Sequence, residues 1–267
     1  MRWRLLAAAC LVAVPATALA QSPADVSVTL TPNVAGKPAR LAVTATGDAL
    51  GSSQRAPKSL SLQIARGLKV DPRSRSARCS AEQAKSFSCP VKSRVATGSA
   101  EGEVSFPPFG TFPFSASVAA FLAPRAQAGD IAGVVVQVRE ASSGRQAMVR
   151  GRVLPVASGP YGVELRFEDF DPGDQAAPPG ASVRLTRLAL SAEAQRTVRR
   201  VRILRRRIKT RRGTRVKRVR VVRRRRYSLI TNPPTCTGAW PYRLRATFPS
   251  SSEVVREGSV PCKSRGS

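Results

Sequence analysis

The stretch WPYRLRATF, from Trp240 to Phe248, indicates most clearly which fold class the chain adopts. Its apolar side chains fall on every even-numbered residue, and mostly arginine or threonine stands between them. Such alternation places one face of a β-strand in an apolar core and the other in water. We therefore predict a strand with a buried even-numbered face. The alternative is an aromatic platform that binds carbohydrate, but apolar stripes of this kind more often belong to a core.

The residues on either side of this strand predict a hairpin. Pro249 to Ser252 are typical turn residues, and the chain from Glu253 to Val260 alternates again. Cys236 and Cys262 stand just outside the two strands. A disulfide between them would clamp the open end of the hairpin and add roughly 3 kcal/mol in the chain-entropy description.

Four cysteines follow the first twenty residues: Cys79, Cys89, Cys236 and Cys262. Their even number, their spacing and the absence of histidine favour disulfides over a zinc site. Four cysteines allow three pairings. We predict the local one, Cys79–Cys89 and Cys236–Cys262, because each pair lies within its own segment.

Alternation with period two recurs along most of the chain. The predicted strands cover Val26–Leu30, Leu60–Ile64, Val118–Leu122, Val134–Val138, Met148–Leu154, Val163–Phe167, Val183–Leu190 and the C-terminal pair. Many short strands separated by Pro, Gly, Asp and Ser predict an all-β fold, an antiparallel β-sandwich. One helical turn is expected where Ser80 and Gln83 fit a capping box. The Pro-rich stretches 106–113 and 172–179 are predicted to be exposed loops.

The first twenty residues resemble a secretory signal peptide. Arg2 and Arg4 precede the apolar run Leu5–Val14, and Ala18-Leu19-Ala20 predicts cleavage before Gln21. The run is too short to span a bilayer, which takes about 20 apolar residues. We therefore expect a secreted protein, extracellular or associated with the cell envelope, with residues 21–267 forming a single β-sandwich domain and no transmembrane span.

Several short motifs resemble those of a group of exported proteins. They are Gly67–Pro72, Cys79–Gln83, Cys89-Pro90, Ser93–Gly98, Ser228–Cys236 and Val260–Cys262. Together they are similar to secreted, functionally uncharacterised β-rich proteins of actinobacteria with two local cysteine pairs. The resemblance implies a secreted β-rich protein with two local disulfides. It implies no activity.

The stretch from residue 196 to residue 226 distinguishes this chain from the exported proteins that it resembles. It holds eighteen of the 45 lysine and arginine residues and no acid, in a chain of net charge +29. Most of its apolar residues are β-branched, which favours strand over helix. We predict a long, protruding basic β-hairpin that turns through Arg211-Arg212-Gly213, because the third residue of a three-residue loop is often a left-handed glycine.

The predicted turn fixes a register for the basic hairpin. Ile208 would pair with Val216, and Ile203 with Val221. Lys209 would lie opposite Arg215, Arg207 opposite Lys217, and Arg206 opposite Arg218. Like charges opposite one another destabilise a β-ladder, and arginine on both faces keeps either face out of an apolar core. An anion lying along the hairpin would relieve the repulsion.

The density of arginine predicts a polyanion-binding surface, since guanidinium groups suit phosphate and carboxylate. The residues assigned to it are Arg199, Arg200, Arg202, Arg205, Arg206, Arg207, Lys209, Arg211, Arg212, Arg215, Lys217, Arg218, Arg220, Arg223, Arg224, Arg225 and Arg226. The expected partners are an anionic polymer, a wall component or an anionic lipid surface. No aromatic residue precedes Tyr227 in the run, so base stacking and sequence-specific nucleic-acid recognition are not expected.

Two further functional classes are compatible with the sequence. In the first, the chain is a structural β-protein and its basic hairpin is an exposed insertion without a binding role. In the second, it is a polysaccharide-acting enzyme that uses Glu164 and Glu168. The absence of histidine excludes Ser-His-Asp catalysis and histidine metal sites, and we expect no enzyme and no cofactor. Asp169, Asp171 and Asp174 form a weak candidate calcium site, since their spacing equally suits an acidic turn.

Overall fold

The computed structural model describes residues 25–50, 56–168, 180–193, 195–210, 213–250 and 252–266. Antiparallel strands dominate these ranges: β1 (Val26–Thr31), β2 (Arg40–Thr46), β3 (Ser59–Ala65), β4 (Lys69–Val70), β5 (Arg94–Phe106), β6 (Gly110–Ala123), β7 (Ala132–Glu140), β8 (Gln146–Pro155), β9 (Tyr161–Phe167), β10 (Ser182–Ala192), β11 (Gln195–Thr210), β12 (Gly213–Ser228), β13 (Ile230–Thr231), β14 (Ala239–Thr247) and β15 (Glu253–Pro261). The helical elements are short: α1 (Ala81–Lys85) and the 3-10 turns η1 (Gly47–Leu50), η2 (Pro72–Ser74) and η3 (Val91–Ser93). The predicted all-β class is confirmed.

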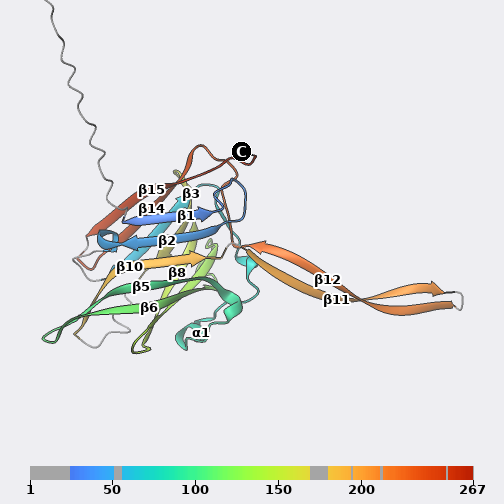
Figure 1. Ribbon diagram of the computed structural model, residues 1–267, viewed down its shortest axis with the longest axis horizontal. Helices are drawn as coiled ribbons and strands as arrows, with labels where there is room; N and C mark the ends of the chain where they lie inside the picture. Colours follow the sequence, from blue (N-terminus) through green and yellow to red (C-terminus); the bar gives the residue numbers. More distant parts are fainter. Residues whose placement is uncertain are drawn as a thin grey trace, which may run out of the picture.

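One large antiparallel sheet forms the body of the protein. Its strands lie in the order β1-β2-β10-β5-β6-β7-β8-β9-β3-β14-β15, and β4 with β13 forms a small separate ladder. Figure 1 shows β1, β2, β10, β5 and β6 stacked in that order along one side. The sheet curls until its two edge strands approach each other, so the architecture is sandwich-like and nearly a closed barrel.

The seam between the two edges is held by side chains and by a short stretch of backbone. The Tyr242 hydroxyl on β14 donates to the carbonyl of Val26 on β1 at 2.9 Å. Tyr242 crosses β15 at Gly258, where a Cβ atom would meet the tyrosine ring at 2.5 Å. Beyond the strands, the Lys263 amide donates to the Asn33 carbonyl at 2.8 Å. These contacts cover sheet edges that would otherwise expose unpaired backbone groups.

The inward residues of the strands form the apolar core of the curled sheet. On β14 the buried face consists of Trp240, Tyr242, Leu244 and Ala246, with Phe248 just beyond the strand. The predicted core face is therefore confirmed. Arg243 and Arg245 lie on the opposite face and pair with Glu257 and Glu253 of β15.

Both predicted disulfides are confirmed. Cys79 is bonded to Cys89, and Cys236 to Cys262. The second bond closes the open end of the β14–β15 hairpin, where the Cys262 amide also donates to the Gly238 carbonyl. The predicted helical turn is α1, in which Ser80 and Gln83 form the capping box.

Replacing Cys236 and Cys262 together by serine is expected to lower the free energy of unfolding by about 3–4 kcal/mol, because the 26-residue loop is no longer closed in the unfolded chain. Urea unfolding followed by circular dichroism measures the loss. In reducing buffer the wild type and the variant should unfold at nearly the same urea concentration. A persistent difference there would contradict the explanation by loop closure.

Strands β11 and β12 form a two-stranded sheet of their own, but the predicted register is wrong by one residue. Thr210 pairs with Gly213, so two residues, not three, separate the strands. Ile208 therefore lies opposite Arg215, and Ile203 opposite Arg220. The predicted like-charge pairs are corrected accordingly: Lys209 faces Thr214, Arg207 faces Val216, and Arg206 faces Lys217.

The predicted loop at 106–113 is also partly wrong. Only residues 107–109 form the turn, and β6 begins at Gly110. Prolines are tolerated in strands mainly at edges and strand ends, and Pro113 lies in the outer part of β6, paired with Glu103 of β5. The other predicted loop, 172–179, lies outside the described residues.

Candidate functional site

The arginine-rich strands β11 and β12 leave the body as a twisted ribbon (Figure 1). Each strand has sixteen residues, which corresponds to about 50 Å at 3.3 Å per residue. The chain that leaves β12 is fixed in the body, because Leu229 and Ile230 are buried and Ile230 pairs with Val70 of β4. The ribbon is thus attached to the core at its base.

The observed register brings basic residues opposite one another. The opposed pairs are Arg199 with Arg224, Arg200 with Arg223, Arg205 with Arg218, and Arg206 with Lys217. Among the predicted polyanion-binding residues, the side chains of Arg205, Arg218, Arg220 and Arg226 are described, and all four are exposed. Arg211 and Arg212 lie outside the described residues, as do the side chains of the remaining members.

The four described arginines lie on one face of the ribbon. Directly opposite residues of an antiparallel pair share a face, and the face alternates along each strand. Arg205 and Arg218 are opposite one another, and Arg220 and Arg226 follow at even spacings along β12. Within the described part of the chain, none of the ion pairs involves these four side chains. Four guanidinium groups on one face can therefore meet an anionic surface together.

Glu164 and Glu168, the candidate catalytic pair, are both held by Arg166. Glu164 is 6 % exposed, and the Arg166 Nε atom donates to it at 2.8 Å. Burial opposes ionisation of Glu164, but hydrogen bonds from Arg166 and Gln63 outweigh it, so the pKa is lowered. A carboxylate that stays ionised at neutral pH is unsuited to the role of a general acid. Glu168 is exposed and lies 3.8 Å from Arg166.

The described residues contain no group of three histidine, cysteine, aspartate or glutamate side chains placed to hold a metal ion. Asp169, Asp171 and Asp174, the weak candidate calcium ligands, lie outside the described residues. Among the residues that the structure describes, no helix is long and apolar enough to cross a membrane.

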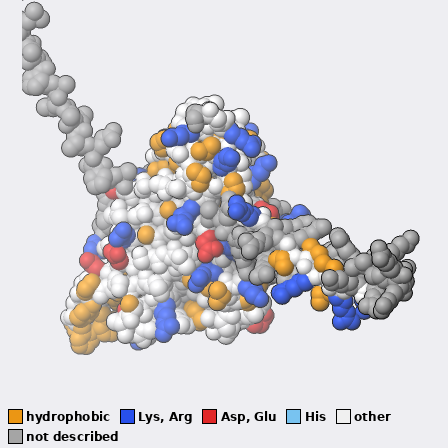
Figure 2. Space-filling model, turned by 45° about the vertical axis from the view of Figure 1, so that its right-hand side comes forward, with side chains coloured by type: hydrophobic (Ala, Val, Ile, Leu, Met, Phe, Trp, Pro, Cys, Tyr) orange, Lys and Arg blue, Asp and Glu red, His pale blue; other side chains and the backbone are white. Residues whose placement is uncertain are grey.

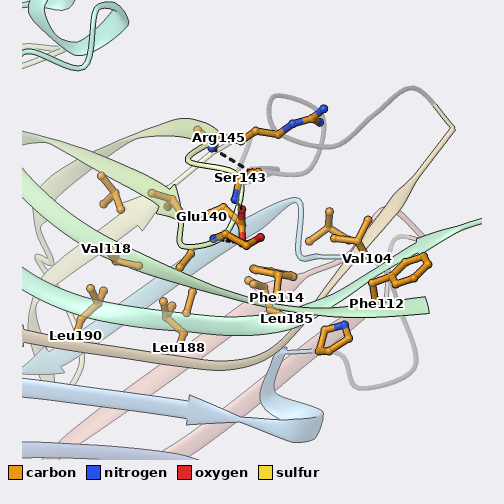
Figure 3. A pocket seen from close by; sticks show the side chains of 18 of the residues that line it. Val104, Phe112, Phe114, Val118, Glu140, Ser143, Arg145, Leu185, Leu188 and Leu190 are labelled. Carbon is orange, nitrogen blue, oxygen red and sulfur yellow. Dashed lines mark hydrogen bonds between the residues drawn. The ribbon is translucent and has the colours of Figure 1, made fainter. Parts of the chain in front are cut away.

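The structure also contains a site that the sequence did not predict, an apolar cavity of about 400 Å³ inside the curled sheet. Its walls come from β5, β6, β7, β8 and β10, which are neighbours in the sheet, and from the inward face of β3 and β9. Figure 3 shows Val118, Leu188 and Leu190 at one end, with Val104 and Phe112 at the other. The volume falls within the roughly 300–1,000 Å³ usual for small-molecule sites.

Two aromatic rings of the wall are seated on glycines of adjacent strands. At Gly102 of β5 a Cβ atom would lie 2.5 Å from the Phe114 ring, and at Gly151 of β8 it would lie 2.5 Å from the Phe167 ring. Both phenylalanines line the cavity. Glycine at these positions lets each ring lie flat against the sheet. The width of the cavity therefore depends on the absence of two side chains.

The polar part of the rim is the turn between β7 and β8. Glu140 accepts hydrogen bonds from the Ser142 amide at 2.8 Å, from the Ser142 hydroxyl at 2.7 Å and from the Ser143 amide. Hydrogen bonds from Ser143 and then Ser142 lower the pKa of Glu140 to about 2. In Figure 3 the Arg145 side chain extends away from the other labelled residues. The Glu140 carboxylate is thus engaged by its own turn.

The sequence contains a feature that relates to the cavity, but its meaning becomes clear only from the structure. Three of the inward residues on its walls are alanines, Ala100, Ala116 and Ala147, each from a different strand. Ala100 and Ala116 are paired neighbours on β5 and β6, and small side chains that lie side by side on one wall leave space in the interior. Whether they lie side by side depends on the strand order, which period-two alternation does not reveal.

Comparison of the chain with protein-family models, with curated proteins and with solved structures found no match. The functional assignment therefore depends on the geometry of the arginine-rich ribbon and of the apolar cavity.

Proposed function

We propose that this chain is a secreted, non-catalytic surface or matrix protein whose strands β11 and β12 bind anionic polymers or envelope surfaces. One observation carries the proposal. The register sets arginine opposite arginine along a ribbon whose sequence from 196 to 226 contains no acid. Each such pair costs stability in the free protein, and a bound anion removes that cost.

The arginine side chains of β11 and β12 suit several kinds of anionic partner. Guanidinium groups donate paired hydrogen bonds to phosphate, sulfate and carboxylate alike. The two disulfides are compatible with an extracellular protein, where these bonds persist and where anionic polymers and lipid surfaces are accessible. Wall polymers, extracellular DNA and anionic lipids share the chemistry that the ribbon would recognise, a repeated negative charge.

The test replaces Arg205, Arg218, Arg220 and Arg226 by glutamine in the full chain. Binding to heparin should weaken by roughly a thousandfold, since four lost contacts to an anion contribute of the order of 1 kcal/mol each. Isothermal titration calorimetry with heparin at 0.1 M salt measures the change. The unfolding midpoint should stay the same or rise, because like-charge repulsion decreases.

A matched control replaces four exposed arginines elsewhere, Arg40, Arg125, Arg150 and Arg265, and so changes the net charge equally. If both variants lose the same affinity, the effect comes from overall charge and the proposal is wrong. If neither loses affinity, the ribbon is an exposed insertion without a binding role.

A further inference from the structure

The apolar cavity opens at the end of the body that carries the turn between β5 and β6. Phe112 connects the two features, because it lines the cavity and is also 53 % exposed. At the turn itself, Phe109 is 69 % exposed and stacks on Phe106 with ring centroids 5.3 Å apart. Exposed aromatic side chains in a group are uncommon on soluble proteins and often mark a contact with another apolar surface.

The β5–β6 turn with Phe106, Phe109 and Phe112, here called the aromatic turn, lies at the opposite end of the body from the arginine-rich ribbon. Figure 1 places the β5–β6 turn at the left and strands β11 and β12 at the right. Figure 2 shows hydrophobic side chains gathered at the same left-hand end. The cavity is therefore spatially separate from the proposed polyanion-binding face, and a ligand in one need not touch the other.

The walls of the cavity restrict the kind of ligand that fits. Branched aliphatic side chains are the largest group in the lining, among them Val118, Val136, Leu185, Leu188 and Leu190, and alanine and phenylalanine supply most of the remainder. The one carboxylate among the described lining residues, Glu140, already accepts hydrogen bonds from its own turn. A ligand that needs several hydrogen bonds would lose them on entering such a site. A flexible hydrocarbon chain loses none.

A second, smaller apolar space lies next to the cavity. It measures about 40 Å³ and shares Leu60, Phe167, Leu188 and Leu190 with the main cavity. Its remaining lining residues are aliphatic side chains of β2, β3, β9 and β14. The apolar lining thus continues from the mouth toward the middle of the sheet. This extended form suits a chain more than a compact ring.

We propose that the cavity binds the aliphatic chain of a lipid, with the polar head left at the mouth beside the aromatic turn. Burial of methylene groups contributes about 0.8 kcal/mol each, which is enough to hold a chain without any hydrogen bond. The exposed phenylalanines Phe109 and Phe112, with the half-buried Phe106 stacked on Phe109, bring the mouth to a lipid surface, where aromatic rings are well accommodated. The proposal is independent of polyanion binding.

The first experiment titrates the full chain with cis-parinaric acid, a fatty acid whose fluorescence rises in an apolar site. Saturable binding of one molecule per chain is expected. Val118→Phe fills the cavity from a buried wall position and should weaken binding by about tenfold or more. Ala147→Leu fills it from the neighbouring wall and serves as the second variant should the first fail to fold.

The matched control is Val91→Phe, the same substitution at a position 72 % exposed and outside the cavity lining. It should bind parinaric acid like the wild type. Equal binding by the wild type, Val118→Phe and Ala147→Leu, or no binding by any of them, would overturn the proposal.

Parinaric acid carries a negative charge, so its uncharged methyl ester is titrated in parallel. Binding of both supports the cavity. Binding of the acid alone, lost in the variant with four glutamines on β11 and β12, would assign the signal to the arginines. That result would overturn the cavity proposal and leave polyanion binding supported.

A second arm identifies the source of the chain. Vesicles of phosphatidylcholine with a parinaroyl chain are mixed with the protein, and transfer to the protein is followed by fluorescence. Transfer that Phe109→Ser abolishes points to a membrane lipid taken up through the aromatic turn. Binding of the free acid without transfer points to a soluble fatty acid. Either outcome supports the proposal for the cavity.

Discussion

Raising the salt concentration from 50 to 200 mM is expected to weaken binding of this protein to duplex DNA by about 10⁴–10⁵-fold. The estimate follows from the ribbon geometry. Residues 196–226 hold eighteen basic side chains, and a two-stranded ribbon presents about half of its side chains, roughly nine, to one face. Each phosphate contact contributes about −0.9 to the slope of log affinity against log salt, so the slope should be near −8.

Fluorescence anisotropy of a labelled duplex at a series of salt concentrations measures this slope. The variant with glutamine at Arg205, Arg218, Arg220 and Arg226 removes four contacts from one face, and its slope should fall to about −4 or −5. The control variant, with glutamine at four exposed arginines of the body, should keep a slope near −8. Duplexes of unrelated sequence should bind equally, since no aromatic side chain precedes Tyr227 in the run.

A slope shallower than about −2 for the wild type would contradict binding along the ribbon. It would mean that only one or two side chains meet the anion at a time. A steep slope that survives in the glutamine variant would place the binding elsewhere on this basic chain.

The strands with clear alternation could be predicted from sequence because their burial is decided locally. In Trp240–Phe248 the apolar residues at even positions alternate with Pro241 and then with arginine or threonine, and the observed burial follows the same alternation. The capping box at Ser80 and Gln83 and the two local disulfides involve residues close in the chain. No strand order was needed for any of these predictions.

The register of β11 and β12 could not be predicted for a physical reason. Register is fixed when one face of a strand is apolar, because a slip by one residue would then expose that face. In this ribbon arginine occupies both faces, so a slip exposes no apolar face. The length of the turn alone therefore determined the predicted register. The structure has two residues between Thr210 and Gly213, where a three-residue loop was predicted.

Strands β2 and β5 were not among the predicted strands, and the cavity was missed with them. β5 has the sequence RVATGSAEGEVSF, in which glycine and charged residues interrupt the alternation. The reason for glycine in this strand becomes clear only once its neighbours are known, because Gly102 leaves room for the Phe114 ring of β6. The small residues can be read from the sequence, but the side chains that pack against them depend on the order of the strands in the sheet.

Replacing Gly98 of β5 by alanine is expected to destabilise the protein by about 3 kcal/mol or more. A Cβ atom at Gly98 would overlap the carbonyl of Ala189 on β10 and would lie 3.0 Å from the Cα atom of Leu190. These atoms are backbone, so the new methyl group can be accommodated only if β5 and β10 move apart. Movement of that kind breaks hydrogen bonds between two central strands.

The sign of the change in stability shows whether the steric contact in the folded protein or the reduced freedom of the unfolded chain dominates. Where a methyl group fits, glycine to alanine stabilises a protein by about 0.4–1 kcal/mol, because the unfolded chain loses freedom. A loss of stability at Gly98 therefore measures the backbone contact directly. Urea unfolding at one temperature gives the difference, and Ser99→Ala, at the next and exposed position of the same strand, is the control.

The same substitution should also affect the cavity. Gly98 pairs with Leu190 of β10 and with Val118 of β6, and both of these residues line the cavity. Moving β10 away from β5 would separate the two walls and weaken the binding of parinaric acid as well as the fold. A Gly98→Ala protein that is as stable as Ser99→Ala would contradict the close approach of the two strands. If it were stable and bound parinaric acid normally, these walls of the cavity would not depend on the spacing that Gly98 permits.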